Sequence, residues 1–135
     1  MAEITYLWKN RAVFPVGSRS FFKAWAKRAF SFFALVKRNN ARRKLVRHGA
    51  IIHSCAEIGE IKAEGDKRNL RVGAFSFMGM VELALHDRIE IGERVCINDG
   101  VLLLTASHSV TDPLWRHVKK PIVIEDYAWV ATNAI

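Results

Sequence analysis

The sequence predicts a mainly β protein, in which a parallel β-solenoid over residues 49–135 follows a basic, largely helical arm over residues 1–48. Two periodicities predict this division. In the second part, large aliphatic residues return every six positions, which suits short strands wound into stacked coils. In the first part, aromatic and aliphatic residues return every three or four positions, which is the spacing of a helix.

The length and composition limit the class of protein. The chain has 135 residues, which suits one domain with a core large enough to need no disulfide bonds. Hydrophobic residues make up 50% and charged residues 25%, which excludes a disordered chain. The two cysteines, Cys55 and Cys96, are too few for a disulfide scaffold or a four-cysteine zinc module.

The charge of the chain is unevenly distributed. Residues 1–50 contain twelve Lys and Arg residues and a single acid, Glu3, for a formal charge of +11. Residues 51–135 contain nine basic and twelve acidic residues, for a charge of −3, so the net charge of +8 arises in the arm. The longest apolar run of the arm, Ala29 to Val36, is far shorter than the about 20 residues that cross a bilayer. No signal-peptide cleavage site follows it, so we expect a cytoplasmic protein.

The arm is predicted to be helical from its apolar spacing. Asn39 and Asn40 are expected to interrupt the helix, and residues 41–47 to resume it until Gly49. The residues expected on the apolar face are Phe22, Trp25, Ala29, Phe33 and Val36.

Two interpretations of the basic arm stay open. It packs as a helix pair on the domain behind it, with solvated Lys and Arg side chains, or it lies on an anionic membrane surface. The second interpretation would place the protein at the inner face of the membrane. We expect no nucleic-acid binding, because no recognised nucleic-acid motif accompanies the basic residues.

The six-residue period is clearest after residue 90. Each hexapeptide is interpreted as one short strand and one corner, with its first and fifth residues filling the interior, so three hexapeptides make one coil. An antiparallel sheet also alternates, but its strands usually repeat every 8–12 residues, roughly, and turn signals are weak here. The hexapeptides begin at Ile91, Ile97, Leu103, Ile124 and Val130, and their fifth residues are Val95, Val101, Ser107, Ala128 and Ala134.

The stretch from Ile89 to Ile135 resembles the bacterial hexapeptide-repeat O-acyltransferases. The resemblance rests on the repeat leading into residues 105–108, on the Asp112-Pro113 loop and on the closing KPIVIEDYAWVATNAI. It is nearest to the branch that acetylates sugars and polysaccharides, alongside the maltose and colanic-acid acetyltransferases, and it covers residues 49–88 only loosely. It implies a left-handed parallel β-helix, a homotrimer, and acetyl-CoA as co-substrate.

His108 is the candidate general base. An alcohol attacks a thioester only when a base removes its proton, and histidine suits this role because its ordinary pKa is about 6.5. His108 precedes a polar, non-repetitive segment over residues 109–121. In the family that the chain resembles, the histidine at this point is the base and the attack is direct. The alternative is a surface histidine at a turn.

Four further residues are candidates for binding the substrate. Asn98 and Asp99 lie at a predicted coil edge and would bind acceptor hydroxyls or orient the base, or they are solvated turn residues. Arg116 resembles the arginine of the family's loop, at an offset one residue longer. Trp129 matches a tryptophan near the family's active-site wall, or it packs at a corner.

No metal is expected, and the residues that bind coenzyme A stay unassigned. A related solenoid family holds zinc with three histidines, but its short histidine spacing is absent among His86, His108 and His117. Members of the resembling family continue for several more coils, so we expect the chain to be a fragment or a truncated product.

The sequence therefore predicts an O-acetyltransferase that moves an acetyl group from acetyl-CoA to a sugar hydroxyl in surface polysaccharide biosynthesis. One alternative is the same chemistry on an antibiotic or serine. The other is a non-catalytic trimeric solenoid that serves binding or assembly.

Overall fold

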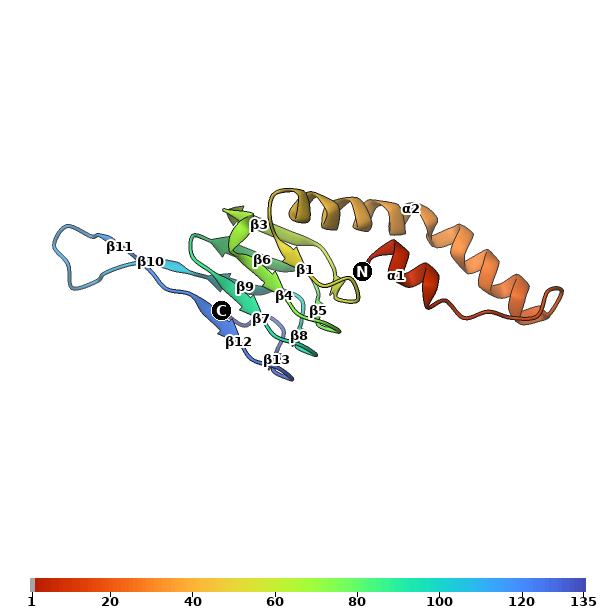
Figure 1. Ribbon diagram of the computed structural model, residues 1–135. Helices are drawn as coiled ribbons and strands as arrows, with labels where there is room; N and C mark the ends of the chain where they lie inside the picture. The colour runs from red at the N-terminus through yellow and green to blue at the C-terminus, as the bar shows by residue number, and fades with distance from the viewer. Residues whose placement is uncertain (1) are drawn as a thin grey trace.

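The computed structural model describes residues 2–135 and shows two helices followed by a mainly β part (Figure 1). Helix α1 covers Ile4–Lys9 and helix α2 covers Arg19–Arg47, and a short 3-10 helix, η1, covers Lys67–Asn69. The strands are β1 (Ile51–Ile52), β2 (Glu57–Ile58), β3 (Ile61–Gly65), β4 (Leu70–Val72), β5 (Phe77–Met78), β6 (Val81–Leu85), β7 (Ile89–Ile91), β8 (Cys96–Ile97), β9 (Val101–Leu104), β10 (Ala106–His108), β11 (His117–Lys119), β12 (Ile122–Ile124) and β13 (Trp129–Val130).

Three parallel sheets make up the β part. Their strand orders are β1-β4-β7-β12, β13-β8-β5-β2 and β3-β6-β9, so successive strands of the chain enter different sheets in turn. We call each set of successive strands a rung: β1–β3, β4–β6, β7–β9, and β12 with β13. Ile51 pairs with Arg71 and Leu70 pairs with Ile89, so an offset of twenty or nineteen residues stacks the second and third rungs on the one before. The offset to the last rung is longer, since Ile89 pairs with Ile122. The prediction of a mainly β part made of parallel strands is confirmed.

The interior of the rungs holds the residues that the six-residue period predicts. Ile91, Val95, Ile97 and Val101 are all buried, and together they are the first and fifth residues of two successive hexapeptides. Burying an aliphatic side chain of this size contributes about 1.5–3 kcal/mol. The same two positions of the last rung, Ile124, Ala128, Val130 and Ala134, are half-buried and pack against this core.

The prediction fails at Ser107, which is exposed rather than interior. The third rung ends at the buried Thr105, whose hydroxyl donates to the carbonyl of Ala84. The chain then leaves the rungs as a hairpin, in which β10 and β11 pair antiparallel and Ala106 lies opposite Lys119. The segment expected to be non-repetitive therefore contains a strand, and the rungs resume at β12 beside β7.

Helix α2 is continuous, so the predicted interruption at Asn39 and Asn40 is wrong. Each asparagine costs a helix at most about 0.7 kcal/mol relative to alanine, and tertiary contacts outweigh that cost here. Arg42, one turn further on, is buried and donates to the carbonyls of Ile52, His53 and Ala56 at 3.1, 2.6 and 2.8 Å. These three hydrogen bonds hold α2 across the first rung.

Both ends of α2 carry ordinary cap residues. The Ser18 hydroxyl accepts from the Phe21 N–H at 3.1 Å at the start. Gly49 follows the end with a left-handed backbone (φ 101°), which glycine adopts without a Cβ clash. The predicted helix end at Gly49 is confirmed.

The inner segment of α2 (residues 37–47) lies over the first rung, and Ala34 just before it also lines a cavity with Ile61 and Val81 (Figure 1). The outer segment (residues 19–36) extends beyond the β part, with α1 alongside it, while the β10–β11 hairpin projects at the opposite side.

Candidate active site

The β10–β11 hairpin places three aromatic rings around its end. His108 on β10 lies directly opposite His117 on β11, and their ring centroids are 4.1 Å apart. The ring of Trp115 stacks on that of His108, with centroids 5.5 Å apart and planes 19° from parallel. His108 is half-buried by these neighbours, whereas His117 and Trp115 are exposed.

A hydrogen bond fixes the proton of the His108 ring. Its Nδ1 lies 2.7 Å from the carbonyl oxygen of Trp115. Because a carbonyl oxygen only accepts, Nδ1 must carry a hydrogen and donate it. In the neutral ring the lone pair then belongs to Nε2, which is the nitrogen free to take a proton from a bound hydroxyl.

The tip of the hairpin is held by Asp112. Its carboxylate accepts from the Arg116 guanidinium and, at 3.0 Å, from the N–H of Leu114. The bond from Arg116, and to a smaller extent that from Leu114, holds the pKa of Asp112 below its ordinary value. Trp115, between the two donors, has a left-handed backbone (φ 51°), which costs a non-glycine residue roughly 1–2 kcal/mol. The tip thus supports the conformation that aims the Trp115 carbonyl at His108.

The other predicted site residues lie on the rungs. Asn98 and Asp99 form the corner between β8 and β9, and the Asn98 N–H donates to the carbonyl of Val130 at 3.0 Å. One carboxylate oxygen of Asp99 accepts from the N–H of Met80 at 2.8 Å, which joins the corner to the rung before it. Trp129 is 72% exposed on β13, where it pairs with Cys96.

The five predicted residues therefore form two groups in one chain. His108 and Arg116 share the hairpin, and the Ser109 N–H beside His108 donates to the Arg116 carbonyl at 3.0 Å. Asn98, Asp99 and Trp129 share the β8–β13 side, and the hairpin projects away from that side (Figure 1).

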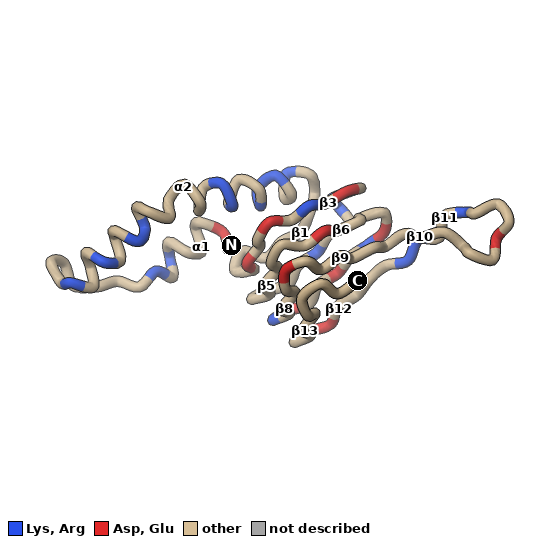
Figure 2. Tube along the Cα trace, turned by 180° about the vertical axis from the view of Figure 1, so that it is seen from behind, with Lys and Arg blue, Asp and Glu red and all other residues tan. Residues whose placement is uncertain are grey.

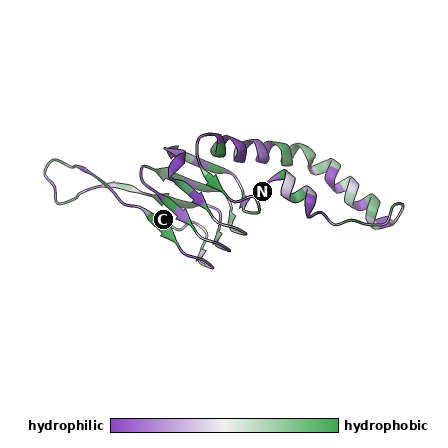
Figure 3. Cartoon of the chain, in the orientation of Figure 1, coloured by the Kyte–Doolittle hydropathy of each residue, from purple (hydrophilic) through white to green (hydrophobic). Residues whose placement is uncertain are grey.

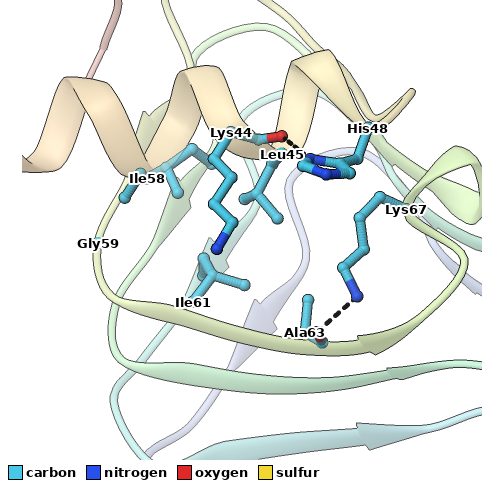
Figure 4. Close-up of a pocket in the computed structure, with 9 residues that line it drawn as sticks. Lys44, Leu45, His48, Ile58, Gly59, Ile61, Ala63 and Lys67 are labelled. Carbon is cyan, nitrogen blue, oxygen red and sulfur yellow. Dashed lines mark hydrogen bonds between the residues drawn. The ribbon is translucent and has the colours of Figure 1, made fainter.

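A separate cavity of about 410 Å³ lies between α2 and the first rung (Figure 4). Lys44, Leu45 and His48 of the helix face Ile58 and Ile61 of the rung. The imidazole of His48 is engaged with the carbonyl of Lys44 at 2.7 Å. The cavity lies at the junction of the helix with the first rung, and none of the predicted site residues lines it.

Within residues 2–135, no group of three or more His, Cys, Asp or Glu side chains is placed to hold a metal ion. Neither α1 nor α2, the two α-helices described in that range, is long and apolar enough to cross a bilayer.

Comparison with known proteins adds no relative: no protein-family model, no curated protein and no solved structure matches the chain. The chemistry of the site therefore rests on its own residues.

Two features of the site were not predicted. Sequence reasoning named His117 among possible metal ligands, but it is the cross-strand neighbour of His108. The carbonyl of Trp115, which sets the His108 tautomer, belongs to the backbone and has no sequence signature. The hairpin pairing would have revealed the first, since residues at equal distances from a turn lie opposite each other.

Proposed function

We propose that the protein is an O-acetyltransferase that transfers an acetyl group from acetyl-CoA to a sugar hydroxyl of a surface polysaccharide or its precursor. The rungs would be those of a left-handed parallel β-helix, as the resemblance implies. The observation that carries the proposal is the bond between His108 Nδ1 and the Trp115 carbonyl, because it leaves Nε2 as a base.

Acetyl-CoA would supply the acetyl thioester. Nε2 of His108 takes the proton of the acceptor hydroxyl while the hydroxyl oxygen bonds to the thioester carbonyl carbon. The carbon–sulfur bond then breaks, and the proton on Nε2 passes to the departing sulfur. The Trp115 carbonyl stabilises the imidazolium between these two steps, since Nδ1–H donates a stronger hydrogen bond when the ring is charged.

The acceptor is proposed to lie along the hairpin. Trp115 is 56% exposed and offers an aromatic face beside the base, and Arg116 and His117 add exposed polar groups. Asn98, Asp99 and Trp129 would join the site from a neighbouring copy in a homotrimer, because one chain keeps the two groups apart. An open hairpin that leaves the rungs is a suitable element to reach such a neighbour.

The test begins with calorimetric titration of the chain with acetyl-CoA, for which we expect a dissociation constant in the micromolar range, or about −8 kcal/mol. Release of the free thiol is then followed with a panel of hydroxyl acceptors, including sugars, serine and an aminoglycoside. The sugars are expected to be acetylated, and turnover with only serine or the antibiotic would redirect the proposal to that acceptor.

The variant His108→Gln is expected to lower kcat by about 10²–10⁴-fold with little change in acetyl-CoA affinity. His86→Gln is the matched control, because His86 is an exposed histidine on the rungs. Equal turnover by the two variants would overturn the role of His108. A folded protein that neither binds acetyl-CoA nor acetylates any acceptor would favour a non-catalytic assembly module instead.

A further inference from the structure

We propose that the outer segment of α2 is a docking surface for an anionic lipid bilayer, on which the helix lies flat. The surface is the phenylalanine face, which consists of Phe22, Ala26, Phe30 and Phe33. These residues follow one another at four, four and three positions and therefore share one side of the helix. Phe22, Phe30 and Phe33 are 64, 92 and 81% exposed.

The phenylalanine face is not used by the fold. The neighbouring side of α2, with Trp25, Ala29 and Phe32, faces Leu7 and Trp8 of α1 across a groove of about 610 Å³. The rungs lie under the inner segment and leave the outer segment free (Figure 1). Figure 3 shows the same contrast, because the hydrophilic end of α2 lies over the rungs and the apolar part extends away from them.

Positive charge surrounds this apolar surface. Lys23, Lys27 and Lys37 are exposed along its margin, and Figure 2 shows basic residues spread along α2. No ion pair within residues 2–135 joins a Lys or Arg of α2 to an acidic side chain. The long stems of lysine let its ammonium group reach lipid phosphates while the aromatic rings enter the apolar boundary.

An anionic bilayer fits these observations better than two other occupants. A second copy would bring another arm of charge +11 against the first, which repels it. A nucleic acid would satisfy the lysines, but single strands are bound in grooves whose aromatic rings stack bases, and this face is the convex side of a helix. The two α-helices described in residues 2–135 are not apolar enough to cross a bilayer, so the contact proposed is with its surface.

Docking in this way leaves the hairpin accessible. The outer segment and the β10–β11 hairpin project from opposite sides of the β part (Figure 1). Binding of the bilayer depends only on the arm, so the proposal stands or falls independently of acetyl transfer.

The test is flotation of the full chain with vesicles of equal parts phosphatidylglycerol and phosphatidylcholine, and with vesicles of phosphatidylcholine alone. The double variant Phe30→Ser, Phe33→Ser is expected to lower the partition coefficient on the mixed vesicles by about tenfold or more. The matched control is Phe75→Ser, which removes a phenylalanine 58% exposed on the rungs and is expected to bind as the unaltered chain does.

Charge gives the second arm of the test. Lys23→Glu together with Lys27→Glu, or an increase of salt from about 0.1 M to 1 M, is expected to weaken binding to the mixed vesicles. The proposal is overturned by equal binding of the phenylalanine variant and the control, or by equal binding to the two kinds of vesicle. Tight binding of a single-stranded oligonucleotide by a chain that ignores both vesicles would assign the arm to nucleic acid instead.

Discussion

The two segments of α2 invert the usual relation between polarity and burial. The inner segment buries Asn39 and Arg42, which are 3% and 4% exposed, whereas the outer segment leaves Phe30 92% exposed. The inner segment lies across the first rung, where Arg42 donates to the carbonyls of Ile52, His53 and Ala56. The outer segment contacts mainly α1 and the loop that follows it, where Arg28 donates to the Ala12 carbonyl at 2.9 Å, and most of its apolar side chains stay exposed.

This difference shows that the surroundings of a helix decide which of its residues are buried. On α2 the buried Arg42 bonds to the first rung, whereas Phe30 on the outer segment is 92% exposed. Substitutions in the two segments should therefore change the free energy of unfolding in different ways.

Arg42→Ala should produce the largest loss. It removes three hydrogen bonds and leaves the carbonyls of Ile52 and Ala56 without the donor they have in the fold, whereas that of His53 still accepts from the Ala56 N–H at 3.0 Å. Each unsatisfied group costs about 1–3 kcal/mol. We expect the free energy of unfolding to fall by about 3 kcal/mol or more in urea denaturation. The control is Arg43→Ala, which removes an exposed arginine from the same turn and should change stability by less than about 0.5 kcal/mol. Similar losses for the two variants would mean that charge, rather than the three bonds, holds the helix to the rung.

Asn39→Ala should have a smaller effect of the opposite sign. The side-chain oxygen of Asn39 is buried without a hydrogen-bond partner among the described residues, and alanine is the better helix former. We expect a gain of about 1 kcal/mol in the same denaturation experiment. Asn40→Ala tests helix propensity alone, because Asn40 is exposed, and it should gain about 0.5 kcal/mol. A loss of stability in Asn39→Ala would contradict this expectation, because it would mean that the side chain of Asn39 makes a stabilising hydrogen bond.

The rungs were predictable from sequence because their period is local. A parallel coil repeats the same interior positions, so the spacing of aliphatic residues within one hexapeptide predicts that Ile91, Val95 and Ile97 are buried, as they are. The hairpin and the unbroken helix were not predictable in this way. The hairpin depends on pairing between β10 and β11, and the continuity of α2 at Asn39 depends on a rung that follows it in sequence.

The candidate site also has a part that sequence could predict and a part that it could not. His108 was predicted from its position after the repeat and from the resemblance to the acyltransferases, and Arg116 from that resemblance alone. Their functional roles stay predictions, but the structure supplies the geometry that sequence lacks. The tautomer of His108 is set by the Trp115 carbonyl. The direction of that carbonyl depends on the backbone conformation of the hairpin, which no residue type encodes. His108 lies apart from Asn98, Asp99 and Trp129 because the chain leaves the rungs at β10 to form the hairpin.

Phe33→Ala should have the smallest effect on stability. Phe33 is 81% exposed, so the substitution removes little buried apolar surface, and we expect a change within about 0.5 kcal/mol. Leu45→Ala is its counterpart on the inner segment, where Leu45 packs against the core of the rungs, and it should cost about 2 kcal/mol. Urea denaturation of the two variants measures the difference directly. An equal loss would show that the phenylalanine face is already covered in solution, and the outer segment would then be an interface between copies of the chain rather than a free surface for lipid.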